Sequence, residues 1–192
     1  LNVIKAAQSI GLPTTSPMMF GHVENYHDIA KHMHELKSLQ LESNGITEFV
    51  PLPYVASEAP MYLRGLSRSG PSFRESVLVH SISRIYFNES IKNIQGSWVK
   101  MGYAGLSYLL DSGINDVGGI LMNETITRSA GATHGQELDL IYIKNIVESK
   151  NMKLIERNTK YDLLKEPTKA NFDKLKLKLK DINYFDQERS FT

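Results

Sequence analysis

The sequence predicts an α/β fold in which parallel strands alternate with helices, equal to about half of an eight-stranded βα barrel. Short apolar runs typical of buried strands alternate four times with helix-like patterns over residues 1–150. The connections are mostly short, and polar residues follow the strands. Because a complete barrel needs about 250 residues for eight units, four units in about 150 residues correspond to half a barrel.

A short helix and a buried strand open the chain. Apolar residues recur at helical spacing from Val3 to Ile10, and Gly11 ends the pattern. Residues 14–20 are an apolar run that predicts a buried strand, with residues 21–24 as its polar exit. Since the chain starts directly in a helical pattern, we expect it to be an internal piece or a processed product of a longer protein.

The second helix and the second strand follow directly. Asn25 and Asp28 have the spacing of a capping box, and Gly45 is the stop signal of the helix between them and the strand. The apolar stripe of this helix consists of Ile29, Met33, Leu36 and Leu39. Residues 46–50 are expected to form the second strand, closed by the two prolines that come after it.

A long loop separates the second strand from the third helix. It spans residues 56–71 and contains Arg64 and Arg68. Ser72 and Glu75 have the spacing of a second capping box, which predicts where the helix begins. The residues that this helix is expected to bury are Val77, Leu78, Ile82 and Ile85.

The remaining two units are shorter. Residues 94–101 are expected to form the third strand, and a short helix over residues 106–110 ends at Gly113. Residues 117–122 are expected to form the fourth strand, and residues 138–147 the fourth full helix.

These units predict two parts of the chain. Residues 1–150 would form the half barrel, and residues 151–192 a C-terminal extension. Lys and Leu alternate strictly over residues 174–180, which is a strand period but also suits a solvated, poorly ordered tail. A small open doubly wound sheet is the alternative fold, although no glycine-rich phosphate loop follows any predicted strand.

The composition argues against several classes of protein. Lys and Arg total 22 against 21 Asp and Glu, and this balance argues against a nucleic-acid partner. No apolar run reaches the roughly 18 residues that span a bilayer, and no signal-peptide pattern is present, so we expect no membrane partner and a cytoplasmic or soluble organelle location. The sequence has no cysteine, which excludes a disulfide framework, cysteine-ligated zinc and a cysteine nucleophile within it.

Polar residues gather where the predicted strands end, which is where a βα barrel carries its chemistry. The densest set is suited to proton transfer or to recognition of a polar heterocycle, and it consists of Asn123, Glu124, His134 and Gln136. The first three are the expected catalytic residues. The expected substrate-binding residues are His22, Glu48, Arg64, Gln95, Ser97 and Gln136.

Each of these interpretations has a structural alternative. Arg64 or Arg68 could bind an amino-acid carboxylate through its guanidinium fork, or could form salt bridges within the loop. His22 could contact a ligand or lie in an exposed loop. Gln95 and Ser97 alternate along the predicted third strand, where polar groups either recognise a ligand or hydrogen-bond internally.

Three histidines near one another are not expected to bind a metal. His32 and His34 are two positions apart in a predicted helix, so they point about 200° apart around its axis and cannot share an ion. His27 does not complete the i,i+4 pair with an intervening glutamate that a metalloprotease helix needs. We therefore expect no metal site in this chain.

Five segments of the sequence resemble one enzyme family. They are residues 19–24, 47–53, 58–62, 93–100 and 115–136. They are similar to the second subunit, or the C-terminal half of the fused form, of the deazaflavin FO synthase. This is the CofH family of radical S-adenosylmethionine 4-hydroxyphenyl transferases. The resemblance covers roughly residues 1–160.

The resemblance implies both cofactors and substrates. The family uses S-adenosylmethionine and a [4Fe-4S] cluster to transfer a 4-hydroxybenzyl group from tyrosine to 5-amino-6-(D-ribitylamino)uracil. It implies a partner subunit or fused domain that completes FO synthase. The family holds its cluster with a C-x3-C-x2-C loop, and this sequence has no cysteine, so the cluster ligands are absent from the chain. We therefore expect the isolated chain to lack transferase activity.

Three other functions remain open from the sequence. The related aminofutalosine-type enzymes of menaquinone synthesis share the scaffold. A half barrel without the cluster could also be an inactive substrate-binding module. A metal-dependent barrel hydrolase is the third possibility, but no set of ligands with suitable spacing supports it.

Overall fold

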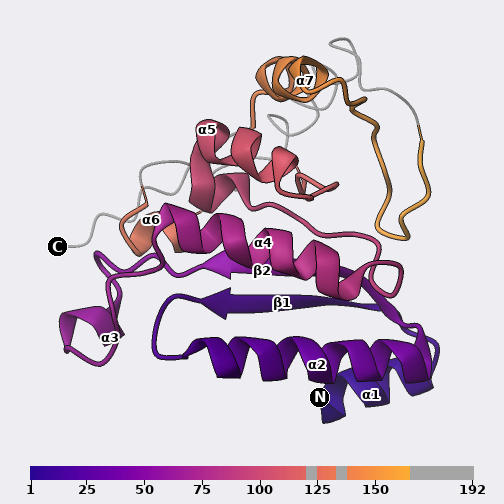
Figure 1. The fold of residues 1–192 in the computed structure, drawn as a ribbon, viewed down its shortest axis with the longest axis horizontal. Helices are drawn as coiled ribbons and strands as arrows, with labels where there is room; N and C mark the ends of the chain where they lie inside the picture. Colours follow the sequence, from indigo (N-terminus) through magenta and orange to yellow (C-terminus); the bar gives the residue numbers. More distant parts are fainter. Residues whose placement is uncertain (120–124, 133–137, 165–192) are drawn as a thin grey trace, which may run out of the picture. The chain divides into compact units, whose positions relative to one another are not determined.

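The computed structural model describes residues 1–119, 125–132 and 138–164 (Figure 1). The chain divides into two compact units, the first ending at Leu138 and the second beginning at Asp139. Within the described residues the fold is mixed α/β, as predicted. The predicted boundary at residue 150 stays a prediction.

The first unit is built on a parallel sheet. Strand β1 (Thr14–Phe20) pairs with β2 (Ile46–Pro53) in parallel, with Ser16 opposite Phe49. Two single parallel bridges continue the order beyond β2, from Phe49 to Ile94 and from Gln95 to Asp116. Each segment therefore pairs with the one before it in the chain, which is the order of a βα barrel and differs from a doubly wound sheet, whose order reverses.

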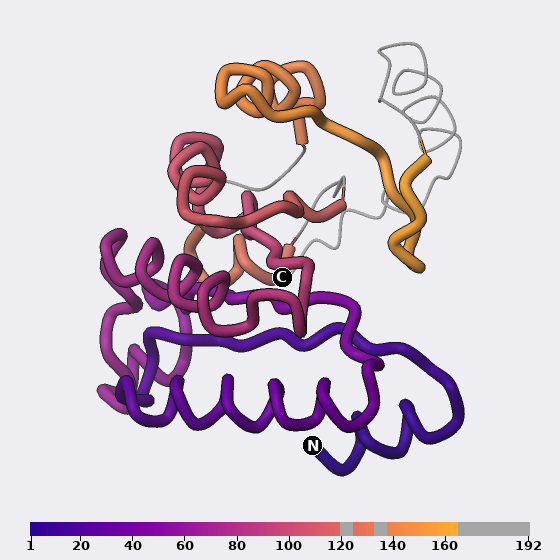
Figure 2. The backbone as a smooth tube through the Cα atoms, turned by 45° about the vertical axis from the view of Figure 1, so that its right-hand side comes forward, coloured from indigo at the N-terminus to yellow at the C-terminus, as the bar shows by residue number. Residues whose placement is uncertain are grey.

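Helices α2 (Tyr26–Ser43) and α4 (Phe73–Phe87) cover one face of this sheet. In Figures 1 and 2, α2 runs beside β1 along the whole strand. On α4, the His80 ring lies edge-on to Phe20 of β1 at 6.5 Å, and Ser83 contacts the sulfur of Met33 on α2. The two helices are thus neighbours over the face that carries the buried Met18 and Phe20.

The opposite face of β1 is not covered by the described residues. Thr15, Pro17 and Met19 alternate with the buried positions of the strand, and all three are exposed. The backbone of Thr14 and of Phe20 bonds toward β2, so Thr15 and Met19 turn their N–H and C=O groups to the other edge, as Pro17 does with its C=O. No strand among the described residues pairs with that edge.

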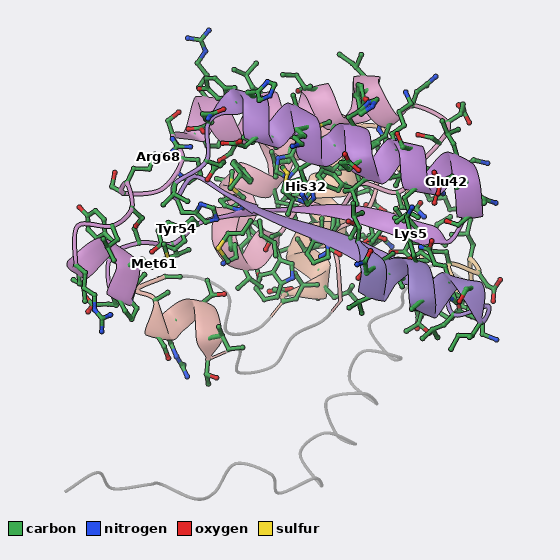
Figure 3. The ribbon with its side chains drawn as sticks, turned by 90° about the horizontal axis from the view of Figure 1, so that it is seen from below. Lys5, His32, Glu42, Tyr54, Met61 and Arg68 are labelled. Carbon is green, nitrogen blue, oxygen red and sulfur yellow. The ribbon has the colours of Figure 1, made fainter. Side chains whose placement is uncertain are left out.

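The first two helices begin and end as predicted. Helix α1 (Asn2–Ser9) precedes Gly11, and its Lys5 pairs with Glu42 of α2 at 3.3 Å (Figure 3). At the start of α2, the Asn25 side chain accepts from the backbone of Asp28, whose carboxylate accepts in return from Asn25 N–H. The predicted capping box is confirmed.

Strand β2 is longer than predicted because its prolines do not end it. The N–H of Phe49 bonds to Asn93 O, on the side of β2 away from β1. Pro51 and Pro53 lie two and four residues after Phe49 in the strand, so their backbone nitrogens face the same side as that of Phe49. The third strand has already ended there, since the chain enters a helix after Ser97. Their missing N–H groups therefore cost no ladder hydrogen bond.

The predicted third strand over residues 94–101 is wrong beyond its first two residues. Ile94 and Gln95 form single bridges, and α5 (Trp98–Asp111) begins after the N-cap Ser97. Trp98 and Val99 are both buried in the first turn of α5, which Gly102 (φ +66°) interrupts before the buried Leu106. Alternation of polar and apolar residues over so short a run could not distinguish the period of a strand from that of a helix.

The predicted fourth strand is reduced to one bridge in the described part of the chain. Asp116 pairs with Gln95, and residues 117–119 are not in a strand. Residues 120–122 lie outside the described residues.

The predicted core of α4 is also wrong. Leu78, Ile82 and Ile85 are exposed, and Val77 is only partly buried. The buried residues of the helix are Glu75, Ser76, Val79, His80, Ser83 and Phe87. A stripe shifted by about one position from the predicted one therefore faces the sheet.

Two short helices were not predicted. Helix α3 (Pro60–Leu63) lies in the expected loop after β2, with a proline at its start. Helix α6 (Ile126–Ser129) lies between segments outside the described residues.

The second unit contains α7 (Leu140–Ser149), two residues offset from the predicted helix. Asp139 caps it by accepting from the N–H groups of Ile141 and Tyr142. A single antiparallel bridge joins Arg157 to Leu163. The Lys- and Leu-rich run lies outside the described residues. None of the described helices is both long and apolar enough to cross a bilayer.

Candidate functional site

The loops that leave β1 and β2 meet at the carboxyl end of the sheet. Arg68 N–H donates to His22 O at 3.0 Å, which joins the loop after β2 to the loop after β1. Gly21 has a φ of +96°, and a Cβ there would lie 2.2 Å from Pro71 Cδ. Only glycine permits both this backbone conformation and this close approach. Figure 3 shows Tyr54 and Arg68 at this end of the sheet, opposite Lys5 and Glu42.

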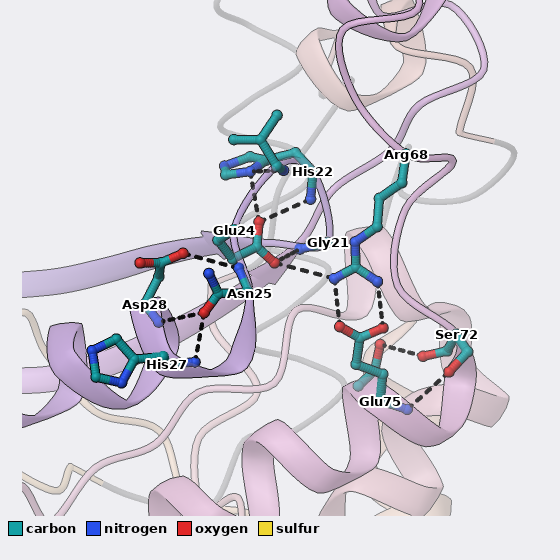
Figure 4. Close-up of polar contacts among 11 residues, drawn as sticks. Gly21, His22, Glu24, Asn25, His27, Asp28, Arg68, Ser72 and Glu75 are labelled. Atoms are coloured by element: carbon teal, nitrogen blue, oxygen red, sulfur yellow. Dashed lines mark hydrogen bonds and ion pairs between the residues drawn. The ribbon is translucent and has the colours of Figure 1, made fainter.

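Glu24 holds the loop after β1 with both carboxylate oxygens (Figure 4). Oε1 accepts from Gly21 N–H at 2.5 Å and from Arg68 Nη2 at 3.2 Å. Oε2 accepts from His22 N–H at 3.0 Å and lies 2.6 Å from His22 Nδ1. The side chain of Glu24 is only 12% exposed, so its carboxylate is committed to this loop and is not open to a ligand.

Arg68 links this carboxylate to a second one. Its guanidinium forms a two-bond fork with Glu75, with Nη1 to Oε2 at 2.8 Å and Nη2 to Oε1 at 2.5 Å. Glu75 N–H in turn donates to the N-cap Ser72. The fork thereby joins the first turn of α4 to the loop after β1. We call Gly21, His22, Glu24, Arg68 and Glu75 the strand-end cluster.

Both carboxylates of the strand-end cluster are held ionised. Burial acts to raise the pKa of Glu24, but hydrogen bonds from backbone N–H groups and from Arg68 outweigh it, so this pKa lies below its ordinary value. The Arg68 fork lowers the pKa of Glu75 against the opposing effect of burial. The pKa of Arg68 rises, chiefly through its hydrogen bonds to Glu75.

Replacing Arg68 with Met is expected to weaken this end of the fold. Two carboxylates would then face each other without a cation, at a cost of about 1–2 kcal/mol, less than for a fully buried pair because Arg68 is 41% exposed. The depressed pKa values mean that this contribution is present at neutral pH and is lost as the pH falls through the folded-state values. Urea unfolding of both forms at pH 7 and pH 3 measures it. An equal difference at the two pH values would contradict the assignment.

His22 stands at the edge of the strand-end cluster. Its side chain is 24% exposed, and its ring lies edge-on to Tyr54 with centroids 5.8 Å apart. Sequence analysis named His22 for substrate binding, and the structure places it at the carboxyl end of a parallel strand, as expected.

Three other predicted binding residues lie in or just after the sheet. Glu48 is buried in β2, and its register opposite Thr15 puts it on the face away from the helices. Gln95 follows the bridge of Ile94, and its side chain packs on Gly118, where a Cβ would lie 2.5 Å from the amide nitrogen. Ser97 is buried as the N-cap of α5, but makes no side-chain capping bond.

The arginines of the loop after β2 differ in their surroundings. Arg68 forms salt bridges, which were the alternative to ligand binding, but its partners Glu24 and Glu75 lie outside the loop in which they were expected. Arg64 is the C-cap residue of α3 and is exposed. Of the two, Arg64 is the one left for a substrate carboxylate, and that role stays a prediction.

The remaining predicted residues lie outside the described part of the chain: Asn123, Glu124, His134 and Gln136. Two described residues near them in the chain, Gly119 and Ala130, bond to the start of α5 and to the loop after β2. Glu58 N–H and Ser57 Oγ both bond to Ala130 O, and Trp98 Nε1 donates to Gly119 O.

Sequence reasoning did not foresee the Arg68–Glu75 pair or the role of Glu24 in holding its own loop. Glu75 carries a capping signal, and the fork that uses its carboxylate has no periodic pattern. The Gly21-x-x-Glu24 spacing after a buried strand is the signal that could have found the loop, since a carboxylate three residues on can reach the glycine N–H.

Comparison with known proteins identifies the family of this chain. The family described as CofH/MqnC C-terminal region matches residues 43–170. The chain belongs to this CofH/MqnC family. It is 43% identical over 164 residues to a protein of Methanopyrus kandleri named 5-amino-6-(D-ribitylamino)uracil–L-tyrosine 4-hydroxyphenyl transferase. A Methanococcus aeolicus protein of the same name is also 43% identical over 164 residues.

The CofH/MqnC chain spans less than half of these relatives. The Methanopyrus match covers 85% of this chain and 44% of the relative. A protein of Nocardia farcinica named FO synthase is 43% identical over 161 residues, which is 84% of this chain and 19% of that protein. The same stretch therefore occurs in proteins of two very different lengths.

The residues present do not fit an iron–sulfur cluster of the usual kind. Such clusters are held by cysteine thiolates, and the sequence has none. Within the described ranges, no group of three or more His, Asp or Glu residues could hold a metal ion. His27, His32 and His34 accordingly form no such group.

Proposed function

We propose that this chain is the C-terminal half of a βα barrel in a radical S-adenosylmethionine enzyme of FO biosynthesis. The enzyme would transfer the 4-hydroxybenzyl group of tyrosine to 5-amino-6-(D-ribitylamino)uracil. The observation that carries the proposal is the 43% identity, over 85% of this chain, with a protein named for that transfer.

The sheet supports the half-barrel part of the proposal. Parallel sheets are normally covered on both faces, yet Thr15, Pro17 and Met19 of β1 are exposed. The outer edge of β1 has no partner strand among the described residues, and α1 buries none of its residues. All three features lie at the N-terminal side of the unit. Because the matching family is a C-terminal region, an N-terminal half of the barrel is the neighbour that would cover them.

The chemistry divides between the two halves. S-adenosylmethionine and a [4Fe-4S] cluster would supply the radical, and the cluster would be held outside this chain, since no cysteine is present. This chain would bind and orient the substrates. Gln95, Ser97 and Glu48 offer polar groups to an aminouracil, which is rich in donors and acceptors, and Arg64 would pair with the tyrosine carboxylate.

Three residues are proposed as catalytic: Asn123, Glu124 and His134. Glu124 and His134 would transfer protons, Asn123 would hydrogen-bond the reacting substrate, and Gln136 would be a further substrate contact. Alanine substitution of Glu124 or His134 in the active enzyme tests each role, and unchanged turnover removes that residue from the mechanism.

A reconstitution experiment tests the proposed function. The chain is coexpressed with the N-terminal region of the Methanopyrus kandleri relative, and the cluster is loaded under anaerobic conditions. We expect the pair to convert tyrosine and 5-amino-6-(D-ribitylamino)uracil, and the chain alone to give no product. A chain in which Met19 is replaced by Asp is the control for assembly, because a carboxylate on the uncovered face should prevent closure of the barrel.

The substrates distinguish this function from that of the menaquinone-type relatives, which the family description also covers. Turnover of a futalosine-type substrate in place of tyrosine and the aminouracil would assign the chain to that branch. Transfer activity of the purified chain alone would contradict the half-barrel proposal.

A further inference from the structure

The outer side of α4 is apolar, which is unusual for a helix on the surface of a unit. Leu78, Ile82 and Ile85 recur along it at helical spacing, and they are 45%, 52% and 78% exposed. We call these three residues the α4 stripe. In the middle of the neighbouring α2, the exposed residues are instead polar or charged: Lys31, His32, His34 and Glu35. A continuous apolar stripe of this kind is typical of a surface that another protein element covers.

The rest of the first unit packs against the other sides of α4, which lies between α2 and α5 (Figure 1). On the side of α2, the Tyr86 hydroxyl is 3.0 Å from His34 Nδ1. On the side of α5, the ring of Phe73 lies edge-on to that of Tyr108, with centroids 5.3 Å apart. The buried side of α4 faces the sheet. An N-terminal half of the barrel would join the unit at its strand edges, and so would not cover the α4 stripe.

The two ends of the α4 stripe carry opposite charges. Arg74 is exposed in the first turn of α4, and Glu89 is exposed directly after the C-cap residue Asn88. No ion pair among the described residues uses either side chain. The helix dipole adds positive charge at the start of α4 and negative charge at its end. An antiparallel second copy of α4 would place each Arg74 near the partner's Glu89, whereas a parallel copy would bring like charges together.

The apolar residues fit the same antiparallel arrangement. Residues 78 and 85 are equally far along the chain from the point between residues 81 and 82, and so are residues 74 and 89. In an antiparallel pair centred on that point, Leu78 would meet the partner's Ile85. Ile82, beside the centre, would contact the partner's Ile82. One centre therefore matches apolar with apolar and positive with negative, as a two-fold symmetric interface requires.

We infer that the α4 stripe is the interface through which two copies of this chain form a two-fold symmetric dimer with antiparallel α4 helices. The inference goes beyond the proposed function and does not depend on the substrates. One pair of helices buries less surface than a standard interface of about 1,600 Å², so we expect a dissociation constant of about 10 μM. The dimer should then predominate at about 100 μM and be mostly dissociated at about 1 μM.

Sedimentation velocity over this concentration range tests the dimer. We expect Ile82→Glu to lower the association constant about 100-fold, because two carboxylates would be buried at the centre of the interface. Met19→Asp, a charge placed on the exposed face of β1, is the matched control and should associate like the parent. Association that is lost in Met19→Asp and kept in Ile82→Glu would overturn the inference in favour of pairing at the sheet. A parent that stays monomeric would overturn it too, and would show that the stripe is covered within one chain.

Disulfide linking tests the register, since the sequence has no cysteine and each introduced thiol is the only one. At the usual helix separation of about 9 Å, two Ile82→Cys chains would bring their thiols within reach of a disulfide. Those of two Ile85→Cys chains would lie about 10 Å apart along the helices and should not link. A mixture of Leu78→Cys and Ile85→Cys chains should link.

The linking is measured in the chain alone and in the pair coexpressed with the N-terminal region. Links in Ile82→Cys and Ile85→Cys alike would indicate parallel helices and overturn the arrangement. Absence of a link in Ile82→Cys at about 100 μM would overturn the interface itself. Neither outcome involves turnover, so failure of the proposed function is detected separately.

Exchange of the end charges tests the pairing of Arg74 with Glu89. Arg74→Glu alone and Glu89→Arg alone should each weaken association about fivefold, because the pair occurs twice in a symmetric dimer. The double variant should regain the association of the parent. Lys31→Glu, on the exposed side of α2, is the control and should have no effect. A double variant that associates no better than the single ones would overturn the antiparallel pairing.

Discussion

Replacing Gly21 with Ala is expected to destabilise the first unit by about 3–5 kcal/mol, from backbone strain and steric overlap together. The φ of +96° is strained for any L-residue with a side chain, and the new Cβ would lie 2.2 Å from Pro71 Cδ and 2.5 Å from Pro71 N. Neither atom belongs to a flexible side-chain end, so the two loops must separate. This movement would also break the bond from Arg68 N–H to His22 O, which joins the two loops.

Substitutions at two other glycines distinguish the cost of backbone strain from the cost of steric overlap. Gly11 has a φ of +78° with open space around a Cβ, so Gly11→Ala should cost only about 1 kcal/mol, from strain alone. Gly119 has neither a positive φ nor a close neighbour, so Gly119→Ala should change stability by less than about 0.5 kcal/mol. Urea midpoints of the three variants measure the series. Similar losses for Gly21→Ala and Gly11→Ala would show that the loop contact with Pro71 has no energetic role.

The stability of the chain is expected to fall by about 3 kcal/mol between pH 6.5 and pH 4 because of His80. This residue is fully buried, and its Nδ1–H donates to Ser76 O, so Nε2 bears no proton and has no hydrogen-bond partner among the residues that the structure describes. Burial lowers the pKa of His80 to about 4, against the opposing bond to Ser76. Between the two values the unfolded chain binds the proton and the folded chain does not, so acid favours unfolding.

His80→Leu tests this expectation with a side chain of similar size. The variant should be at least as stable as the parent at pH 7.5, because it removes a buried acceptor without a partner. It should lose the dependence on pH between 6.5 and 4, apart from that of other groups. His27→Leu, at an exposed position, should keep the parent's pH dependence. Parallel unfolding curves for the parent and His80→Leu across this range would refute the assignment.

The strand-end cluster connects the expected effect of Gly21→Ala to the proposed function. Gly21 lets the loop after β1 lie against Pro71, and Glu24 closes that loop from within. The result is a histidine held at a strand end by a charged network that is itself anchored in α4. Changes that loosen Gly21 are therefore expected to reduce both stability and turnover.

Much of the fold follows from local signals in the sequence. Residues 14–20 form a strand where one was predicted, although only every second side chain is buried there. Helix α2 begins after Asn25 because its capping box satisfies free N–H groups. The family resemblance drawn from five segments is confirmed by the match to the CofH/MqnC C-terminal region. These features depend on residues close together in the chain, and so the sequence alone determined them.

Other features were decided by contacts between distant residues. Ser97 ends the third strand and begins α5, which allows Pro51 and Pro53 to remain in β2. On α4, His80 is buried and Ile82 is exposed, so the apolar pattern of the helix does not by itself show which side faces the sheet. In each case the sequence contains two compatible patterns, and the packing of the neighbouring element selects one.

The candidate site divides in the same way. The sequence by itself placed His22 after the end of a strand, where a parallel sheet carries its chemistry, whereas it placed Gln95 inside a strand that the structure ends early. It could not determine that Arg68 binds two carboxylates or that Glu24 accepts from the backbone N–H groups of Gly21 and His22. Those outcomes depend on distances of 2.5–3.2 Å between groups up to 44 positions apart. Only the tertiary structure sets such distances, since hydrogen bonds and charges act through space and not along the chain.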